Sequence, residues 1–464
     1  MSVAQIGQRP RPAQGTLRHR GGGGLQIAFA AGLGLIVVAA ALLAPPEFAI
    51  ATAILGFFFV LALYDTWSMV LFLMLVRSSL DALSDTGVLA GQNIATWLSL
   101  LLIGVGLAYI ASQHVELRKV PLAKPFMALL GVWAAGVVVS LDPVASFQDW
   151  LRALGTFLLY VYLVHALSDE GRRDLFLKVV VLSAVLPTMV GVYQLASGSG
   201  NQVTEGFNRI FATFAHPSPF AFYLLVILPL AAVMGLHSRT PATRLGASLL
   251  SILMAVCIIA TFTRIAWLGL LVTLMILLWM RNRAGVMVVP LVVVVAVVLV
   301  PGVNDRLLGS GNLDSGEGRL DLWGNALAHT SISQLPFGLG LDSVELLTGN
   351  AAHNDYVRLW IETGVLGIAA FAWLYVSAVR LGLQAVRARL PGYGSALAAT
   401  FVAVLAARLV MMLTDNLTVH PVLEWYLWAF AALVVAMKTS GRDVPRRAAY
   451  PPGGRIPAAT SHSR

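Results

Sequence analysis

Ionisable and amide side chains gather at one point of this otherwise apolar sequence, directly before a long hydrophobic stretch. Residues 353–367 read HNDYVRLWIETGVLG. A histidine side chain can accept and release a proton, so His353 is the first candidate for a general base. Asp355 is the rival base, and Asn354 and Tyr356 are candidate supporting residues. The segment therefore predicts a site of proton transfer at the entrance of a membrane span.

Simpler roles account for several side chains of this segment. Arg358 and Glu362 are spaced i, i+4, which favours an intrahelical ion pair worth a few tenths of a kcal/mol. Asn354 or Asp355 suits the N-cap of a helix. These roles leave His353 without a structural explanation, and Glu362 is kept as a supporting candidate.

Two arginines border apolar stretches elsewhere in the sequence. Arg209 opens RIFATFAHPSPFA (209–221), which contains His216 and precedes a span. Arg264 lies in ATFTRIAWLG (260–269), between two apolar runs. A charge at such depth costs roughly 2.5–3.5 kcal/mol on insertion scales and is usually retained for a partner or a pathway. Snorkelling of Arg209 to headgroups and a tight surface turn at Arg264 are the alternatives.

A further polar cluster follows a late apolar stretch. It comprises Thr414, Asp415, Asn416, His420 and Glu424. Turn formation and helix capping explain these residues at least as well as catalysis does. By topology the cluster falls on the same side of the membrane as His353, so Asp415 is kept as a supporting candidate.

The elements that must position these groups are membrane helices. The chain has 464 residues, is 58% hydrophobic and 11% charged, and has a mean hydropathy of +0.80. We therefore predict an all-α polytopic integral membrane protein with about 12–14 transmembrane helices. The candidate spans are 25–44, 48–64, 67–82, 94–112, 122–141, 150–167, 174–196, 219–236, 245–262, 265–280, 285–300, 358–383, 395–414 and 421–437.

The placement of the positive charges predicts the orientation. The net charge is +9, and most of the 31 Lys and Arg residues fall on the side that carries both termini, which places the termini in the cytoplasm. This placement explains the basic composition without nucleic acid. The cations left for the outer side or the membrane are all arginine, whose planar fork of donors suits phosphate oxygens: Arg77, Arg152, Arg209, Arg264, Arg306, Arg319, Arg358 and Arg408.

Three regions follow from this topology. Residues 1–24 and 438–464 are predicted to be disordered cytoplasmic tails, and 25–437 form the membrane domain. Two outward loops, about 197–217 and 301–356, are longer than simple turns. Apolar residues recur at helical spacing between Arg319 and Ser333, which predicts a short interfacial helix in the second loop.

Motifs for nucleotide, dinucleotide or metal binding are missing from the sequence. It has no G-x-x-x-x-G-K-[ST], H-E-x-x-H, C-x-x-C or Asp-x-Asp pattern, and its single cysteine, Cys257, lies in an apolar run. We expect no metal and no cofactor. Any reaction must then use arginines, histidines and carboxylates near the outer face.

These stretches together resemble the O-antigen ligase and O-antigen polymerase family over about residues 200–430. The resemblance lies in T-F-x-H-P (213–217) after Arg209, T-R-x-A-W-L-G (263–269), G-R-x-x-x-W (318–323), P-F-G-x-G (336–340), H-N-x-Y-x-x-x-x-x-E-T-G-x-x-G (353–367), and D-N (415–416) followed by P-x-x-E-W (421–425). Ser218 departs from the family pattern, in which many members have Asn.

The resemblance implies glycan transfer on the periplasmic face of the bacterial inner membrane. The donor would be a glycan on undecaprenyl diphosphate, and the acceptor a hydroxyl of the lipid A core or a second lipid-linked glycan. It further implies that Arg209 and Arg264, with Arg319, bind the diphosphate and that His353 carries the reaction without a metal. Ligase and polymerase remain alternatives, with the ligase slightly preferred. A transporter is disfavoured because the unusual residues gather at one face and no repeat is present.

Overall fold

The computed structural model describes residues 46–83, 87–89, 92–198, 202–204, 207–287, 321–325, 327–328 and 336–440. The predicted spans 25–44 and, for the most part, 285–300 lie outside these residues, as do both predicted tails apart from 438–440. The chain divides into two units, Met1–Asp65 and Thr66–Arg464. In the first unit the structure describes one helix, α2 (Pro46–Tyr64).

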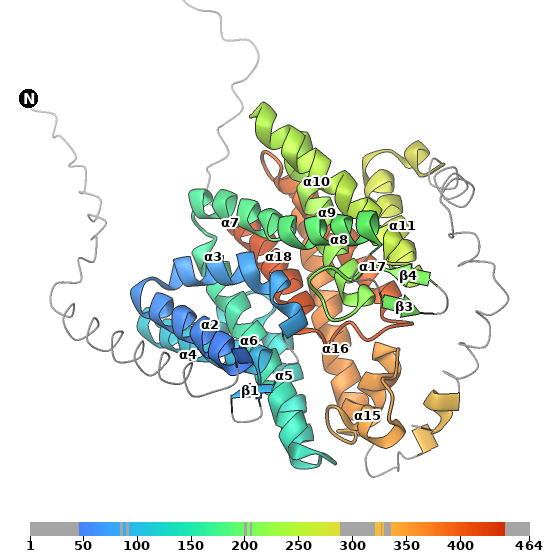
Figure 1. The fold of residues 1–464 in the computed structure, drawn as a ribbon. Helices are drawn as coiled ribbons and strands as arrows, with labels where there is room; N and C mark the ends of the chain where they lie inside the picture. Colours follow the sequence, from blue (N-terminus) through green and yellow to red (C-terminus); the bar gives the residue numbers. More distant parts are fainter. Residues whose placement is uncertain are drawn as a thin grey trace, which may run out of the picture. The chain divides into compact units, whose positions relative to one another are not determined.

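The second unit is a helical bundle, drawn in Figure 1. Its α-helices are α3 (Thr66–Val76), α4 (Ile94–Gln113), α5 (Ala123–Val138), α6 (Pro143–Ala166), α7 (Glu170–Leu182), α8 (Val185–Ser197), α9 (Pro217–His237), α10 (Pro241–Ala260), α11 (Arg264–Arg281), α15 (Ser343–Thr348), α16 (Asp355–Arg387), α17 (Gly394–Met411) and α18 (Pro421–Ser440). Short 3-10 helices are η1 (Arg77–Ser79), η2 (Asp81–Leu83), η3 (Leu117–Lys119) and η4 (Arg283–Met287). Two hairpins pair β1 (Gly87–Leu89) with β2 (Gln92–Asn93) and β3 (Gln202–Thr204) with β4 (Phe207–Arg209).

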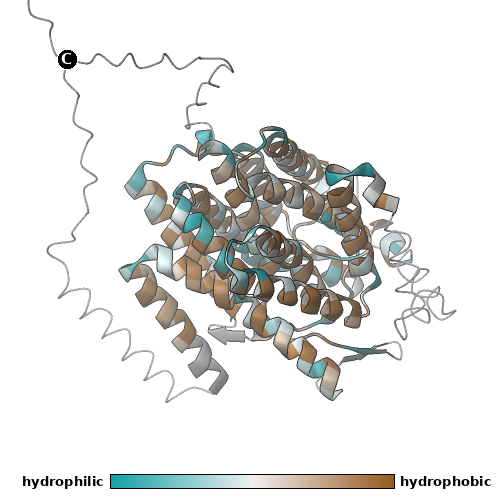
Figure 2. Ribbon diagram, turned by 90° about the horizontal axis from the view of Figure 1, so that it is seen from above, coloured by the Kyte–Doolittle hydropathy of each residue, from teal (hydrophilic) through white to brown (hydrophobic). Residues whose placement is uncertain are grey.

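The helices confirm the predicted all-α polytopic membrane fold. Within the described residues, eight helical stretches are long and apolar enough to cross a membrane, with α7 and α8 counted as one stretch. Figure 2 shows hydrophobic residues along the helices and hydrophilic ones mainly at helix ends and connections. A polypeptide in lipid must satisfy its backbone groups internally, and helices do so.

The stretch predicted as one span at 174–196 contains a break between α7 and α8. Pro187 has no N–H and cannot donate to the carbonyl oxygen of Ser183, one helical turn earlier. The Ser78 hydroxyl donates to that oxygen over 3.0 Å. The Ser183 hydroxyl lies 2.7 Å from the hydroxyl of Tyr223 in α9. The break therefore links this span to η1 and α9.

The centre of the bundle is α18, which contacts α6, α9, α16 and α17. Its window of apolar residues is 78% buried, as is that of α9. The contacts are largely aromatic: Tyr426 meets Tyr223 of α9 at a ring distance of 4.9 Å, and Trp428 meets Tyr375 of α16 at 5.9 Å. These contacts hold α9 and α16 against α18.

Helix α16 is broken at Gly364, whose φ of +64° and ψ of −165° are not helical. Backbone hydrogen bonds join this break to the segment 336–340: Leu339 N to Ile361 O (2.9 Å), Gly340 N to Glu362 O (3.0 Å) and Leu366 N to Pro336 O (3.2 Å). A Cβ atom at Gly338 would lie 2.4 Å from the carbonyl carbon of Glu362. Glycine at position 338 is therefore required for the close approach of the two backbones.

Candidate active site

The two arginines predicted to act together lie at one turn. The short strand β4 ends at Arg209, which is only 6% exposed. Its Nε donates to the carbonyl oxygen of Thr261 (2.8 Å), and its Nη2 donates to the hydroxyl of Thr263 (3.0 Å). Arg264 follows directly and begins α11. The connection between α10 and α11 therefore binds the guanidinium of Arg209 and is followed directly by Arg264.

The segment after Arg209 is held by a glutamine that the sequence analysis did not select. The Gln194 side-chain oxygen, on α8, accepts from the backbone N–H groups of Phe211 (3.1 Å) and Ala212 (2.8 Å). Ala212 has a positive φ of +53°, which is unfavourable for alanine, and the hydrogen bonds to Gln194 help to stabilise this backbone conformation. A polar residue within an apolar helix is the sequence feature by which Gln194 could have been selected.

His216 lies at the end of the same segment and caps α9. Its Nδ1 accepts from the backbone N–H of Ser218 over 3.3 Å. Burial lowers the pKa of His216, and the positive charge of Arg209 lowers it further, with smaller contributions from His420 and His353. The carboxylate of Asp415 acts in the opposite direction. His216 is therefore within electrostatic range of Arg209, Asp415 and His353.

The start of α16 is joined to the α17–α18 connection by hydrogen bonds. Asn354 caps the helix, because its side chain accepts hydrogen bonds from the N–H groups of Tyr356 and Val357. Of the two predicted caps, Asn354 and Asp355, the structure therefore has Asn354. The Asp355 side chain is fully buried. Its carboxylate accepts from Leu417 N (2.7 Å), Thr418 N (3.1 Å) and Thr418 Oγ1 (2.5 Å), and it lies 3.4 Å from Arg358 Nε. Asp355 thus stabilises the junction between the two segments.

His353 precedes this junction and has a left-handed φ of +50°. Its side chain is 48% exposed, and its Nδ1 lies 3.9 Å from the Asp415 carboxylate, which is 19% exposed. Burial by itself would raise the pKa of Asp415, but contacts with His353 and the Asn416 N–H, and the charge of His420, lower it below its usual value. Asp415 is therefore an anionic partner for an accessible imidazole.

The structure thus brings five side chains to one end of the bundle from three separate parts of the chain. The cluster consists of Arg209, His216, His353, Asp415 and His420, with Arg264 at the adjoining turn. Imidazole and guanidinium groups outnumber carboxylates in this list. Such a set favours a ligand with negative charge and provides one histidine that is open to solvent.

Residues 249–372 match the model of a family described as O-antigen ligase. This part of the chain is therefore similar to the O-antigen ligase family. The matched range contains Arg264 and His353, whereas Arg209, His216 and Asp415 lie outside it. Comparison with curated proteins gives no match for this chain.

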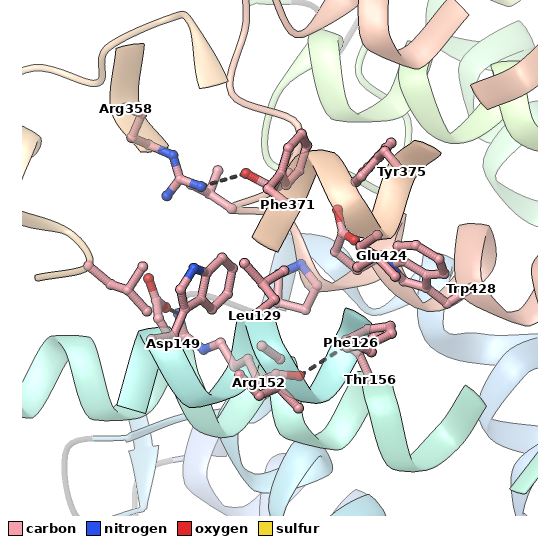
Figure 3. A pocket seen from close by; sticks show the side chains of 18 residues that line it. Phe126, Leu129, Asp149, Arg152, Thr156, Arg358, Phe371, Tyr375, Glu424 and Trp428 are labelled. Atoms are coloured by element: carbon pink, nitrogen blue, oxygen red, sulfur yellow. Dashed lines mark hydrogen bonds and ion pairs between the residues drawn. The ribbon is translucent and has the colours of Figure 1, made fainter. Parts of the chain in front are cut away.

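Arg358 and Glu424, which belong to the polar segments noted in the sequence, line a cavity between helices. Glu362 forms the predicted ion pair with Arg358 (3.3 Å), and Arg358 Nη2 donates to the hydroxyl of Thr418 (2.5 Å). Arg358 lines the cavity shown in Figure 3, which is enclosed by α5, α6, α16 and α18 and is mostly aromatic and aliphatic. Glu424 also faces this cavity and pairs with Arg408. Both carboxylates therefore have structural partners in the interior.

Two predicted supporting features concern the edges of the cluster. The Tyr356 hydroxyl donates to the carbonyl oxygen of Leu409 (2.8 Å), which ties α16 to α17. Arg319 lies outside the described residues. Trp323 lies four positions after Arg319. Its indole N–H donates to the carbonyl oxygen of Ala352 (2.7 Å), next to His353, so this part of the loop contacts the segment that carries His353. Residues 321–325 are helical, in agreement with the predicted interfacial helix.

Proposed function

We propose that this protein transfers a glycan from undecaprenyl diphosphate, or a related polyprenyl diphosphate, to a hydroxyl group of the lipid A core. Transfer would take place on the periplasmic face of the bacterial inner membrane, with both chain termini in the cytoplasm. The observation that carries the proposal is the cluster of Arg209, His216 and His353 beside the Arg264 turn. The match of residues 249–372 to the O-antigen ligase family supports glycan transfer in general.

The diphosphate would lie against the arginines. When the glycan leaves its carrier, negative charge develops on the diphosphate, and preorganised guanidinium groups in a site with little water stabilise it. Arg209 is preorganised because Thr261 and Thr263 hold its side chain. Arg319 is the third proposed diphosphate ligand. Since arginines supply the charge, we expect transfer to persist in the presence of a metal chelator.

His353 would act as the general base. The acceptor oxygen attacks the anomeric carbon, the bond from that carbon to the diphosphate oxygen breaks, and the diphosphate keeps the electron pair. The proton of the acceptor hydroxyl passes to His353. Because Nδ1 faces Asp415, the other ring nitrogen, Nε2, is the proton acceptor. An in-line displacement of this kind inverts the anomeric configuration.

The surroundings of Asp355 support this choice of base. Its carboxylate is fully buried and accepts hydrogen bonds from Leu417 and Thr418. A base must contact the proton that it removes, and a side chain enclosed by its own fold is poorly placed to do so. His353 is half exposed beside the arginine cluster. We assign Asp355 to positioning, with Asn354 and Tyr356.

The test uses purified protein in vesicles with a glycan on undecaprenyl diphosphate. With lipid A core added, a ligase releases undecaprenyl diphosphate and forms glycosylated lipid A core, with or without chelator. If the donor alone yields longer lipid-linked chains and lipid A core remains unmodified, the protein is an O-antigen or exopolysaccharide polymerase. If the intact protein forms neither product while a known ligase is active in the same vesicles, glycan transfer is refuted.

A further inference from the structure

A second cavity lies far from His353, near the opposite end of α16. It has a volume of about 320 Å³, within the range of small-molecule sites. It is lined by Ser377, Arg380, Leu381 and Gln384 of α16, Val435, Lys438 and Thr439 of α18, and Pro121 just before α5. No role in the proposed glycan transfer requires this cavity.

Helical spacing explains why these side chains meet. Positions 377, 380, 381 and 384 follow the i, i+3, i+4, i+7 pattern of one helix face, and 435, 438 and 439 form the facing surface of α18. The Lys438 ammonium donates to the Gln384 side-chain oxygen over 2.5 Å, which holds it at the cavity. On the remaining wall, Tyr160 donates to the carbonyl oxygen of Pro121 (2.6 Å).

The described lining is basic and contains no acidic residue. Arg380 and Lys438 carry the charge, and the other polar groups come from Ser377, Gln384 and Thr439. The cavity near Arg358 differs, because Asp149 and Glu424 line it together with arginines. A pocket with two cations and neutral donors favours a phosphate group, which arginine binds through paired N–H donors.

Exposed apolar residues precede the cavity on the same face of α16. Trp373 and Val376 are 50% and 45% exposed, and they precede Arg380 by about two turns and one turn on the same face. A ligand with a phosphate at Arg380 can therefore extend a hydrocarbon chain along α16. Basic pockets between membrane helices are known to bind anionic lipid headgroups in this way.

We propose that this cavity binds the phosphate of an anionic phospholipid, with Arg380 and Lys438 as ligands and an acyl chain along Trp373 and Val376. Free inorganic phosphate shares the headgroup chemistry but has no acyl chain. The proposal does not depend on the glycan-transfer activity, because the cavity is separate from the arginine–histidine cluster.

Binding of radiolabelled phosphatidylglycerol to the purified full chain in neutral detergent tests the proposal. We expect phosphatidylglycerol to bind in preference to phosphatidylcholine, and Arg380→Gln and Lys438→Gln each to weaken binding about fivefold, as one basic residue at a membrane surface would. Arg387→Gln is the matched control: it removes the same charge from an exposed position on α16 that does not line the cavity. This control should stay within about twofold of the unmodified protein.

Three results would overturn the proposal. The first is equal binding of phosphatidylcholine and phosphatidylglycerol. The second is an equal effect of Arg387→Gln and Arg380→Gln, which would indicate diffuse attraction to a basic surface. The third is full displacement of the lipid by millimolar inorganic phosphate, which would assign the site to the free anion. If Arg380→Gln fails to fold, Lys438→Gln and a Ser377→Leu substitution that narrows the cavity provide the same comparison.

Discussion

Arg209 donates from its guanidinium to the hydroxyl of Thr263, which lies 54 positions later in the chain and directly precedes Arg264. Replacement of Thr263 by Val removes the acceptor and leaves a buried cation with one hydrogen bond fewer. A hydrogen bond to a charged group contributes about 1.5–3 kcal/mol, so we expect kcat/KM for glycan transfer to fall about 10- to 100-fold.

The control for this variant is Thr273→Val on the same helix. Thr273 is equally buried and donates to the carbonyl oxygen of Gly269 within α11, away from Arg209. It should keep near-normal transfer at a similar unfolding temperature. Equal losses in both variants would mean that Thr263 acts through the stability of α11 and not through Arg209.

Substitution at His353 and at Asp355 should affect different properties. His353→Gln removes the proposed base from a half-exposed position, so transfer should fall about 10²- to 10⁴-fold with little change in unfolding temperature. Asp355→Asn leaves the buried Arg358 without one of its carboxylates, and loss of such a partner costs about 3–5 kcal/mol. Asp355→Asn should therefore lower the unfolding temperature clearly.

A pH–rate profile separates the two residues further. The acidic limb of the unmodified protein should disappear in His353→Gln and remain in Asp355→Asn. If His353→Gln keeps near-normal turnover while Asp355→Asn folds stably but is inactive, Asp355 is the base and His353 is not.

The stability of the protein should depend on pH through Asp342. Burial raises the pKa of Asp342 to about 6, and the negative charges of Asp149 and Glu345 add to this effect. The folded state then holds the proton more tightly than the unfolded state, so stability falls as pH rises from about 4 to about 6. Asp342→Asn also suits the left-handed φ of +67°. The substitution should raise the unfolding temperature by roughly 1–3 °C at pH 8 and hardly change it at pH 4. The expected shift is small because solvent screens this partly exposed group. An equal shift at both values would exclude titration as the cause.

Two glycines with similar backbones should tolerate alanine differently. Gly338 and Gly349 have φ values of +74° and +68°, so alanine strains both by about 1–2 kcal/mol. At Gly338 the new Cβ would meet backbone atoms of Glu362 at 2.4 Å, whereas at Gly349 no atom of the described residues lies within 4 Å. We expect Gly338→Ala to abolish accumulation of folded protein and Gly349→Ala to retain it, as measured by size-exclusion chromatography. Similar yields would show that the contact with α16 can relax.

Hydropathy predicted the membrane helices well because the length of an apolar run limits where a span begins and ends. The predicted spans 94–112 and 421–437 correspond to α4 and α18 within a few residues. The break before Val185 and the kink at Gly364 escaped prediction, because their partners, Ser78 and the segment 336–340, lie elsewhere in the chain.

The site was predictable in its residue types and in the end of the bundle where they lie. An arginine or histidine beside an apolar run is unusual, which is why Arg209, Arg264 and His353 were selected. The burial of Asp355 was not predictable, since it depends on Leu417 and Thr418, 62 and 63 positions away. Gln194 was missed because a single polar residue in a span does not reveal which backbone groups it binds.

The hydrogen bonds between the break in α16 and the segment 336–340 also constrain biogenesis. The carbonyl groups of Ile361 and Glu362 lie in the first turns of an apolar helix, and their donors, Leu339 and Gly340, belong to a preceding loop that is synthesised earlier. Until that loop folds back, these carbonyls face lipid or water. Since unsatisfied backbone groups are costly in lipid, we expect α16 to take up its broken conformation only when the loop docks. Translation order therefore favours correct assembly, because the loop leaves the ribosome before the helix that it completes.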